Sequence, residues 1–170
     1  MVSKEEIFEA LDKMILSVSG WRGVFALNGS EESTTDKIDE SHRFISGAAA
    51  LVFAEYLKNS QGKAKVLLGC DTRPTGKAIA SAMVPVLLAA DCEVCYAGFV
   101  AAPEIMAWAR SCDKISGRTG FIYISASHNP IGHNGIKFGL TDGGVLAAEE
   151  SLKLIKDFHF FWNLMIVLKK

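Results

Sequence analysis

Short apolar runs alternate with longer segments of helical apolar spacing, and this alternation constrains the fold more than any other feature. The apolar runs predict strands over residues 24–27, 65–70, 94–99, 121–124 and 136–138. Apolar spacing and capping residues predict helices over residues 4–16, 41–59, 76–90, 103–112 and 149–157, with Thr75 as the N-cap of the third. Short buried strands separated by helices are typical of a sheet that is covered on both faces. We therefore expect the α/β class, as a three-layer α/β/α domain with a mixed, mostly parallel sheet.

Composition limits the number of domains and the kind of partner. The 170 residues suffice for one domain. The 18 Lys and Arg residues nearly balance 19 Asp and Glu, so that the formal net charge is −1. Because nucleic acids and anionic membranes attract an excess of basic residues, this balance argues against both as partners. A small anionic substrate is compatible with it, since one or two well-placed cations are enough to hold such a molecule.

The N-terminus and the cysteines bear on the cellular compartment. The chain starts with charged residues and lacks the apolar stretch of a secretory signal, so a cytoplasmic location and reduced thiols are expected. Cys92 and Cys95 have the spacing of a redox pair. A redox pair, however, lies between a strand and the helix that follows it. This pair is expected to run from the end of a helix into a strand, and unpaired thiols are therefore the favoured interpretation.

Two polar loops each follow a predicted strand. Residues 71–76 come directly after the strand over 65–70, and residues 125–130 come directly after the strand over 121–124. In a layered α/β sheet, the loops beyond the carboxyl ends of the strands form the functional edge. We expect both loops to lie at this edge, with Arg22 as a further candidate for it.

The second loop combines groups that suit one kind of chemistry. Ser127 is followed by His128, Asn129 and Pro130, and the proline interrupts regular structure. No Gly-x-Ser-x-Gly elbow is present, which disfavours a serine hydrolase. Hydroxyl, imidazole and amide groups close to Lys137 suit phosphoryl chemistry, in which an oxygen nucleophile accepts the phosphoryl group and a cation balances its charge.

Three motifs together resemble one enzyme family. The run from Ser125 to Pro130, followed by Asn134-Gly135-Ile136-Lys137-Phe138, resembles the active-site serine loop of the α-D-phosphohexomutases. Two weaker features occur in the expected order: Gly20-Trp21-Arg22-Gly23 resembles the Arg-Gly turn of the family, and residues 69–76 resemble its Gly-x-Asp-x-Arg segment. The resemblance therefore implies that residues 1–158 form the N-terminal α/β/α domain I of such an enzyme.

The resemblance implies a role for each matching residue. Ser127 would be phosphorylated and would exchange its phosphoryl group with the sugar, so that hexose 1-phosphate and hexose 6-phosphate interconvert through a bisphosphate. His128 would transfer or orient a proton, and Lys137 would assist that proton or stabilise the phosphoryl charge. Arg22 would bring a guanidinium group to the phosphate. The residues expected to support the loop are Asp71, Arg73, Asn129 and Asn134, while Ser125 is expected only to hydrogen-bond and His133 to be a solvated loop residue.

The resemblance also implies a metal ion and further domains. Mg²⁺ would be bound by the phosphate on Ser127 and by a second-domain loop of the type Asp-Gly-Asp-x-Asp-Arg, and a hexose bisphosphate would act as activator. The sequence contains no such loop. Because phosphoryl transfer needs its charge neutralised by metal and cationic groups, the isolated chain is expected to be inactive as a mutase. The expected partners are a phosphorylated glucose, mannose or glucosamine and the missing mutase domains.

Residues 159–170 form a densely apolar tail that departs from the α/β pattern. The tail is too short for a membrane span, which needs about 20 apolar residues, and it is unlike a polar linker. It either packs on the domain or is the out-of-register end of a truncated reading frame, and the second interpretation is favoured. The tail also motivates an alternative function as a non-catalytic module that binds phosphosugars or a partner protein. The oligomeric state is left open.

Overall fold

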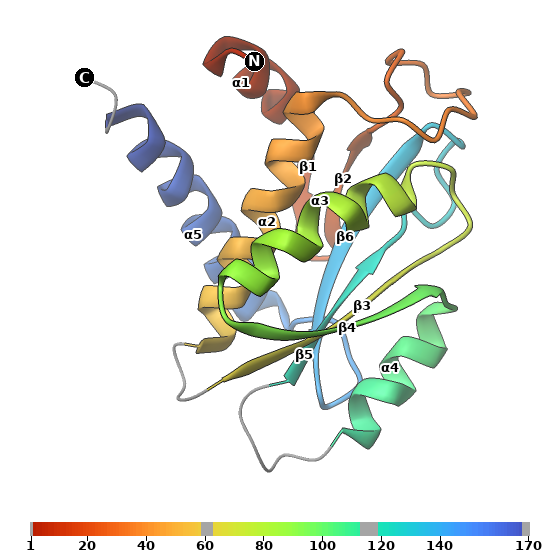
Figure 1. The fold of residues 1–170 in the computed structure, drawn as a ribbon, viewed down its shortest axis with the longest axis vertical. Coiled ribbons are helices and arrows are strands. Elements are labelled where there is room, and N and C mark those ends of the chain that lie inside the picture. Colours follow the sequence, from red (N-terminus) through yellow and green to blue (C-terminus); the bar gives the residue numbers. More distant parts are fainter. Residues whose placement is uncertain (1, 59–62, 113–118, 168–170) are drawn as a thin grey trace.

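The computed structural model describes residues 2–58, 63–112 and 119–167 (Figure 1). The helices are α1 (Lys4–Asp12), α2 (Glu40–Lys58), α3 (Gly76–Ala89), α4 (Ala102–Ser111) and α5 (Ala148–Val167). The strands are β1 (Ile15–Ser17), β2 (Gly20–Val24), β3 (Ala64–Cys70), β4 (Cys92–Phe99), β5 (Thr119–Ile124) and β6 (His133–Leu140). The predicted α/β class is confirmed.

The six strands form one mixed sheet in the order β1-β2-β6-β5-β3-β4. Strand β3 pairs in parallel with β4 and β5, whereas β1 with β2, β2 with β6 and β6 with β5 pair antiparallel. The expectation that most of the sheet is parallel is therefore corrected, since parallel pairing is confined to one half. Parallel neighbours need a crossover of about a dozen residues or more. The connections from β1 to β2 and from β5 to β6 are shorter than that and permit antiparallel pairing only.

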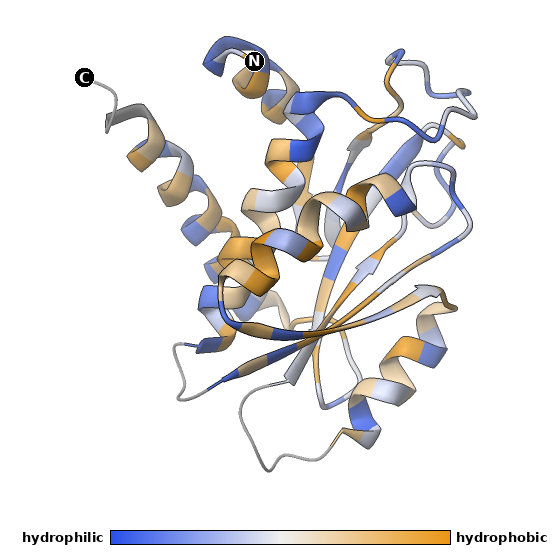
Figure 2. Ribbon diagram, in the orientation of Figure 1, coloured by the Kyte–Doolittle hydropathy of each residue, from blue (hydrophilic) through white to orange (hydrophobic). Residues whose placement is uncertain are grey.

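Helices cover both faces of the sheet, although unequally (Figure 1). Helices α2 and α3 lie on one face, where α1 and α5 pack against α2. Helix α4 lies on the opposite face, against β3, β5 and β6. Hydrophobic residues gather on α2, on α3 and along the central strands, whereas the connection between β2 and α2 is mostly hydrophilic (Figure 2). The three-layer architecture is confirmed, with the larger core between the sheet and α2.

The β1–β2 hairpin stands where the sequence predicted the end of a helix and a later strand. Ile15 continues the helical spacing of Ile7 and Leu11, and periodicity alone therefore extends the helix too far. In the structure Ile15 is 53% exposed and pairs with Arg22 across the hairpin. Gly20 closes the turn at a φ of 134°, a conformation that glycine adopts without the steric cost of a Cβ atom. The hairpin brings Arg22 next to β6.

Helix α5 continues through much of the segment that the sequence marked as a separate tail. Leu154, Phe158 and Trp162 follow one another at a spacing of four and form a single buried stripe. The Trp162 ring lies 5.8 Å from the Phe158 ring and 5.9 Å from the Phe8 ring, measured between centroids. Residues 159–167 therefore pack on the domain as the last turns of a helix, and residues 168–170 lie outside the described part.

The two closely spaced cysteines are both on β4. Because side chains alternate along a strand, residues three positions apart point to opposite faces of the sheet. Cys92 packs into the larger core and Cys95 against the cluster beneath α4, and all four cysteines are free. The interpretation as unpaired thiols is confirmed.

Within the described residues, no helix combines the length and apolar character that crossing a membrane requires.

Candidate functional site

The two polar loops meet at one edge of the sheet, as the sequence predicted. The segment 71–76 follows β3, and the serine loop, residues 125–132, follows β5, the parallel neighbour of β3. The ends of β3 and β5 are joined by a hydrogen bond where the two loops begin, because Asp71 N–H donates to the carbonyl oxygen of Ile124 at 3.0 Å. Parallel pairing of β3 and β5 is what places both loops at the same edge.

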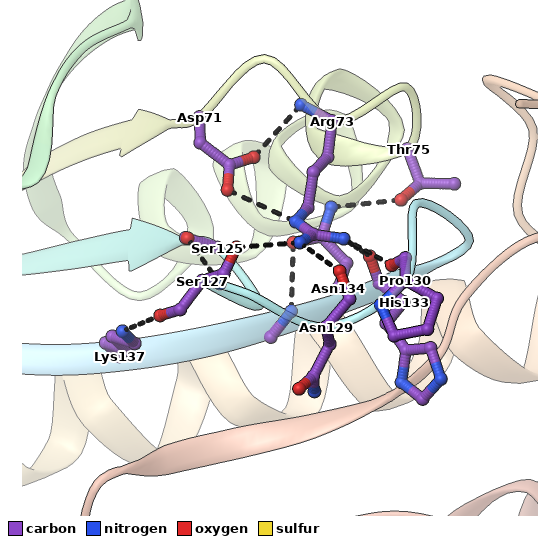
Figure 3. A network of polar contacts seen from close by, with 11 residues as sticks. Asp71, Arg73, Thr75, Ser125, Ser127, Asn129, Pro130, His133, Asn134 and Lys137 are labelled. Carbon is purple, nitrogen blue, oxygen red and sulfur yellow. Dashed lines mark hydrogen bonds and ion pairs between the residues drawn. The ribbon is translucent and has the colours of Figure 1, made fainter. Parts of the chain in front are cut away.

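Ser127 is exposed at the tip of a strained turn. Its φ of 56° lies in the left-handed region, which costs a non-glycine residue about 1–2 kcal/mol. The backbone N–H of Ser127 donates to Ser125 Oγ at 3.0 Å, a hydrogen bond of the kind expected for Ser125. Lys137 Nζ donates to Ser127 Oγ at 2.7 Å (Figure 3). The serine hydroxyl is thus presented to solvent with a cation against it.

A small cavity of about 190 Å³ opens beside this hydroxyl. Strand β2 reaches it through its pairing with β6, which sets Arg22 opposite Gly135. The four residues predicted as catalytic all line this cavity, namely Ser127, His128, Lys137 and Arg22. Asn129 lines it as well. The remaining lining residues are Ser19, Gly20, Trp21, Ser125 and Ala126.

The charge of this cavity suits an anion. Arg22 and Lys137 supply two cations, and its lining contains no carboxylate from the described residues. Complete ligand pockets have volumes of about 300–1,000 Å³, and this cavity is smaller, as expected of part of a site. A larger hollow of about 840 Å³ lies between α1 and the start of α2, but Glu6, Glu9, Asp39 and Glu40 line it and would repel a phosphate.

Arg73 is nearly buried, with 8% of its surface exposed, and it holds the serine loop through backbone carbonyls. Its Nη2 donates to the carbonyl oxygens of Ser127 at 2.8 Å and Asn129 at 2.6 Å. Its Nη1 donates to those of Pro130 and, at 3.1 Å, His133. Figure 3 shows the guanidinium at the centre of these contacts. The bracing position predicted for Arg73 is what the structure shows.

Asp71 and Asn134 also support the loop instead of lining the cavity. Asp71 Oδ1 accepts the backbone N–H of Arg73 at 3.0 Å, and its Oδ2 lies 3.4 Å from Arg73 Nε. Asn134 is fully buried; its Nδ2 donates to Thr75 Oγ1 at 3.0 Å, and its Oδ1 accepts the N–H of Gly135 at 2.9 Å. The Asn134 side chain thus joins the segment after β3 to β6, whereas the Asp71 side chain holds Arg73 within that segment.

Two residues behave differently from their sequence-based interpretation. Thr75 was predicted as the cap of α3, but its hydroxyl makes no capping hydrogen bond and accepts from Asn134. A threonine before a helix carries no signal for this alternative use. His133 is not a solvated loop residue, because its side chain is only 18% exposed and its Nε2 lies 3.3 Å from Glu31 Oε1. The chain from β2 to α2 folds over it, since Gly132 N–H donates to the Glu31 carbonyl at 2.7 Å.

A metal ion would find few ligands among these residues. In the parts of the chain that the structure describes, no three His, Cys, Asp or Glu side chains gather closely enough to hold an ion. Asp71, which lies beside the serine loop, has both oxygens engaged by Arg73. A phosphate on Ser127 would offer oxygen ligands, but the residues present do not complete a Mg²⁺ site.

Similar proteins are consistent with a single family. The family model described as phosphoglucomutase/phosphomannomutase, alpha/beta/alpha domain I, matches residues 18–159. Curated relatives include a phosphoglucosamine mutase of an Exiguobacterium species, 36% identical over 112 residues that make up 65% of this chain and 24% of the relative. Another is the phosphoglucosamine mutase of Bacillus licheniformis, 37% identical over 98 residues, 58% of this chain and 21% of the relative. The chain thus spans about a quarter of the length of these relatives or less.

Solved structures share the same architecture. A structure described as that of a phosphomannomutase from Thermus thermophilus superposes with a TM-score of 0.63 at 25% identity, over 84% of this chain and 29% of that one. A phosphoglucomutase/phosphomannomutase family protein from Burkholderia thailandensis gives the same TM-score at 23% identity and supports the fold, over 85% of this chain and 29% of the other. The family-model match, which covers most of the chain and includes the serine loop, Arg22 and Arg73, shows that the chain belongs to the phosphoglucomutase/phosphomannomutase family and carries its α/β/α domain I.

Proposed function

We propose that this chain is the serine-bearing catalytic domain of a phosphohexomutase that interconverts hexose 1-phosphate and hexose 6-phosphate. The observation that carries the proposal is the exposed Ser127 hydroxyl, which accepts a hydrogen bond from Lys137 inside a cation-lined cavity. Enzymes of this family are phosphomutases, and an exposed hydroxyl beside two cations suits a group that stores a phosphoryl group between two transfers.

Each transfer exchanges one oxygen–phosphorus bond for another. When Ser127 is charged, a bond from Oγ to the phosphorus of a hexose bisphosphate forms and the bond from phosphorus to the sugar oxygen breaks. The hydroxyl proton leaves Oγ and the sugar oxygen gains a proton. The reverse transfer to the other hydroxyl of the sugar completes the interconversion.

The surrounding side chains divide the work between charge and proton. Lys137 Nζ donates to Oγ and so brings a cation to the place where phosphoryl charge would develop. His128 lines the same cavity and is the candidate proton acceptor. Arg22 offers a planar guanidinium that suits two phosphate oxygens at once.

The substrate and the metal ion belong to the same proposal. The curated relatives are named phosphoglucosamine mutases, which favours a phosphorylated glucosamine as the hexose. Members of this family generally use Mg²⁺, which would supply further charge neutralisation when bound to the phosphate on Ser127. Since the described residues do not complete a metal site and the chain spans about a quarter of the length of its relatives, the remaining ligands and the sugar contacts would come from additional domains.

Phosphate mapping tests the proposal. The chain is incubated for extended times with a hexose bisphosphate and Mg²⁺, and any modification is located by mass spectrometry; we expect slow phosphorylation of Ser127, since Arg22 and Lys137 neutralise only part of the phosphoryl charge. Ser127→Ala should abolish the modification, whereas Ser19→Ala, which removes another hydroxyl from the lining of the same cavity, should retain it. Phosphate found only at other residues, and retained in Ser127→Ala, would overturn the proposal.

The alternative of a non-catalytic phosphosugar-binding module rests on the same cavity, in which Arg22 and Lys137 would face a bound anion while the described residues do not complete a metal site. Calorimetry with glucosamine 6-phosphate distinguishes the binding module from the phosphoryl-accepting domain. A binding module should bind the sugar phosphate with equal affinity in the parent chain and in Ser127→Ala, and neither should become phosphorylated by the bisphosphate.

A further inference from the structure

The guanidinium of Arg73 has its hydrogen-bond donors engaged within the protein. An arginine carries five N–H groups and no acceptor. Nη1 and Nη2 make four hydrogen bonds, all to carbonyl oxygens of the segment from Ser127 to His133. Nε faces Asp71 Oδ2 at 3.4 Å. Arg73 is also nearly buried, so it is not free to bind a phosphate from solvent.

Three of the four carbonyls come from the serine loop between β5 and β6, and the fourth belongs to His133, the first residue of β6. Carbonyl oxygens repel one another, and gathering them around one point requires a cation with donors that diverge in a plane. The guanidinium has this geometry, whereas a lysine ammonium is a point charge with three donors. Asp71 holds the guanidinium from the other side and is anchored in turn by its N–H to the Ile124 carbonyl.

Ser127 stands at the start of the stretch that Arg73 gathers. Its carbonyl points to Arg73, and its backbone N–H is held by Ser125 Oγ. With both neighbouring peptide groups fixed, the residue is kept at a φ of 56°, and its Oγ faces Lys137 on the other side of the loop (Figure 3). A left-handed serine persists only where its surroundings determine the backbone, and such strain is concentrated at functional sites.

We infer that Arg73 is a positioning residue for the nucleophile: by binding three carbonyls of the serine loop and that of His133, it holds Ser127 in the left-handed conformation that aims Oγ at Lys137. Arg73 touches neither substrate nor reacting atoms and acts through the loop. The inference deepens the proposed function, because Ser127 is the group that is positioned, but its main test requires no phosphoryl transfer.

The test compares Arg73→Lys with Arg43→Lys, a matched control at an exposed arginine whose Nε lies 3.6 Å from Glu40. The Cα and Cβ chemical shifts of Ser127 report its backbone region, and amide exchange reports the loop hydrogen bonds from Asn129 to Ala126 and from His133 to Pro130. In Arg73→Lys we expect the Ser127 shifts to leave their left-handed values and both amides to exchange faster. In Arg43→Lys both readouts should stay at their parent values.

A second variant decides the matter if Arg73→Lys does not fold. Asp71→Asn keeps the guanidinium and removes the charge that anchors it, and we expect the same displacement of the Ser127 shifts to a smaller extent. The inference would be overturned if Arg73→Lys folds and leaves the Ser127 shifts and the exchange rates unchanged. If Arg73→Lys does not fold, the same unchanged signals in Asp71→Asn would overturn it. A lowered unfolding midpoint with an unmoved Ser127 would overturn it too, since that is the result of a merely structural arginine.

Phosphoryl transfer gives an additional readout where Ser127 proves to be the acceptor. A nucleophile misplaced by about 1 Å loses on the order of 10²-fold in rate. Arg73→Lys should show such a loss in the rate of Ser127 phosphorylation at an unchanged apparent KM for the bisphosphate, because Arg73 has no donor left for the substrate. A raised KM with unchanged loop signals would instead make Arg73 a substrate ligand. If the parent chain takes no phosphate while the loop signals respond as expected, the proposed function fails and the positioning role stands.

Discussion

Lys137 Nζ lies 2.7 Å from Ser127 Oγ, although one residue is in a strand and the other in a loop. The contact follows from the antiparallel pairing of β5 and β6, which sets Lys137 opposite Tyr123 and lets the serine loop fold back towards it. Gly20 on β2 leaves room for the lysine, because a Cβ atom there would stand 3.0 Å from Lys137 Cγ. Three strands therefore cooperate to place one cation against one hydroxyl.

Replacing this cation should slow the charging of the serine. Lys137→Met keeps most of the side-chain volume and removes the donor and the charge. We expect phosphorylation of Ser127 by a hexose bisphosphate to slow by about 10²-fold, as when one donor to a developing charge is removed from an active site. The initial rate of phosphate incorporation into Lys137→Met, compared with that of the parent chain, measures this loss. Lys153→Met, at an exposed lysine of α5, should react at the parent rate, and equal rates in all three proteins would rule out this role for Lys137.

Local motifs identified the residues of the candidate site better than the contacts that those residues make. The serine loop, the residues around Arg22 and the segment after β3 were all identified from short stretches of sequence, because their residue types are contiguous. The carbonyl contacts of Arg73 join positions 54 to 60 apart in the sequence, and backbone carbonyls carry no sequence signal at all. The sequence therefore allowed the prediction that Arg73 supports the site, but it did not indicate which backbone carbonyls Arg73 contacts.

The fold shows the same division between local and long-range information. Helical spacing found every helix of the described residues, but it extended the first one to residue 16 and ended the last one at residue 157. The first error arose because Ile15 fits the period yet belongs to a hairpin set by Gly20. The second arose because the residues after 157 are apolar on several sides, so that the stripe through Phe158 and Trp162 is visible only once its partners on α1 and β2 are in place.

The buried hydrogen bond between Asn134 and Thr75 should contribute to stability as a pair. Asn134→Ala leaves the Thr75 hydroxyl, which is 1% exposed, without this donor, and we expect the free energy of unfolding to fall by about 1–3 kcal/mol. Thr75→Val should behave similarly. The double variant should lose less than the sum, since neither group is then left unsatisfied. Urea unfolding of the four proteins measures the coupling, and strictly additive losses would contradict it.

The last turns of α5 should matter to the stability of the whole domain. Trp162 is 4% exposed and contacts aromatic rings of α1, α2 and α5. Trp162→Ala should lower the free energy of unfolding by about 3–5 kcal/mol, the usual cost of removing a large buried ring. Phe160→Ala, two positions away and 68% exposed, should change it by less than about 0.5 kcal/mol. Equal effects of the two substitutions would show that this segment does not pack as described.

Alkaline pH should destabilise the fold through Tyr96. Burial, followed by the neighbouring Cys70 thiol, raises the pKa of Tyr96 to about 12, from its usual value of about 10. The fold therefore favours the neutral phenol: its contribution to stability is complete below about pH 10 and is lost as the pH rises through about 12. Because 46% of Tyr96 is exposed, solvent screens part of this effect. Titration by tyrosinate absorbance should show late ionisation, part of which Tyr96→Phe removes; another part belongs to Tyr123, because burial raises the pKa of that phenol as well. The urea midpoint of Tyr96→Phe should fall less over this pH range than that of the parent. Tyr123→Phe is the control that keeps the ionisation of Tyr96, and a titration of Tyr96→Phe equal to that of the parent would refute the assignment.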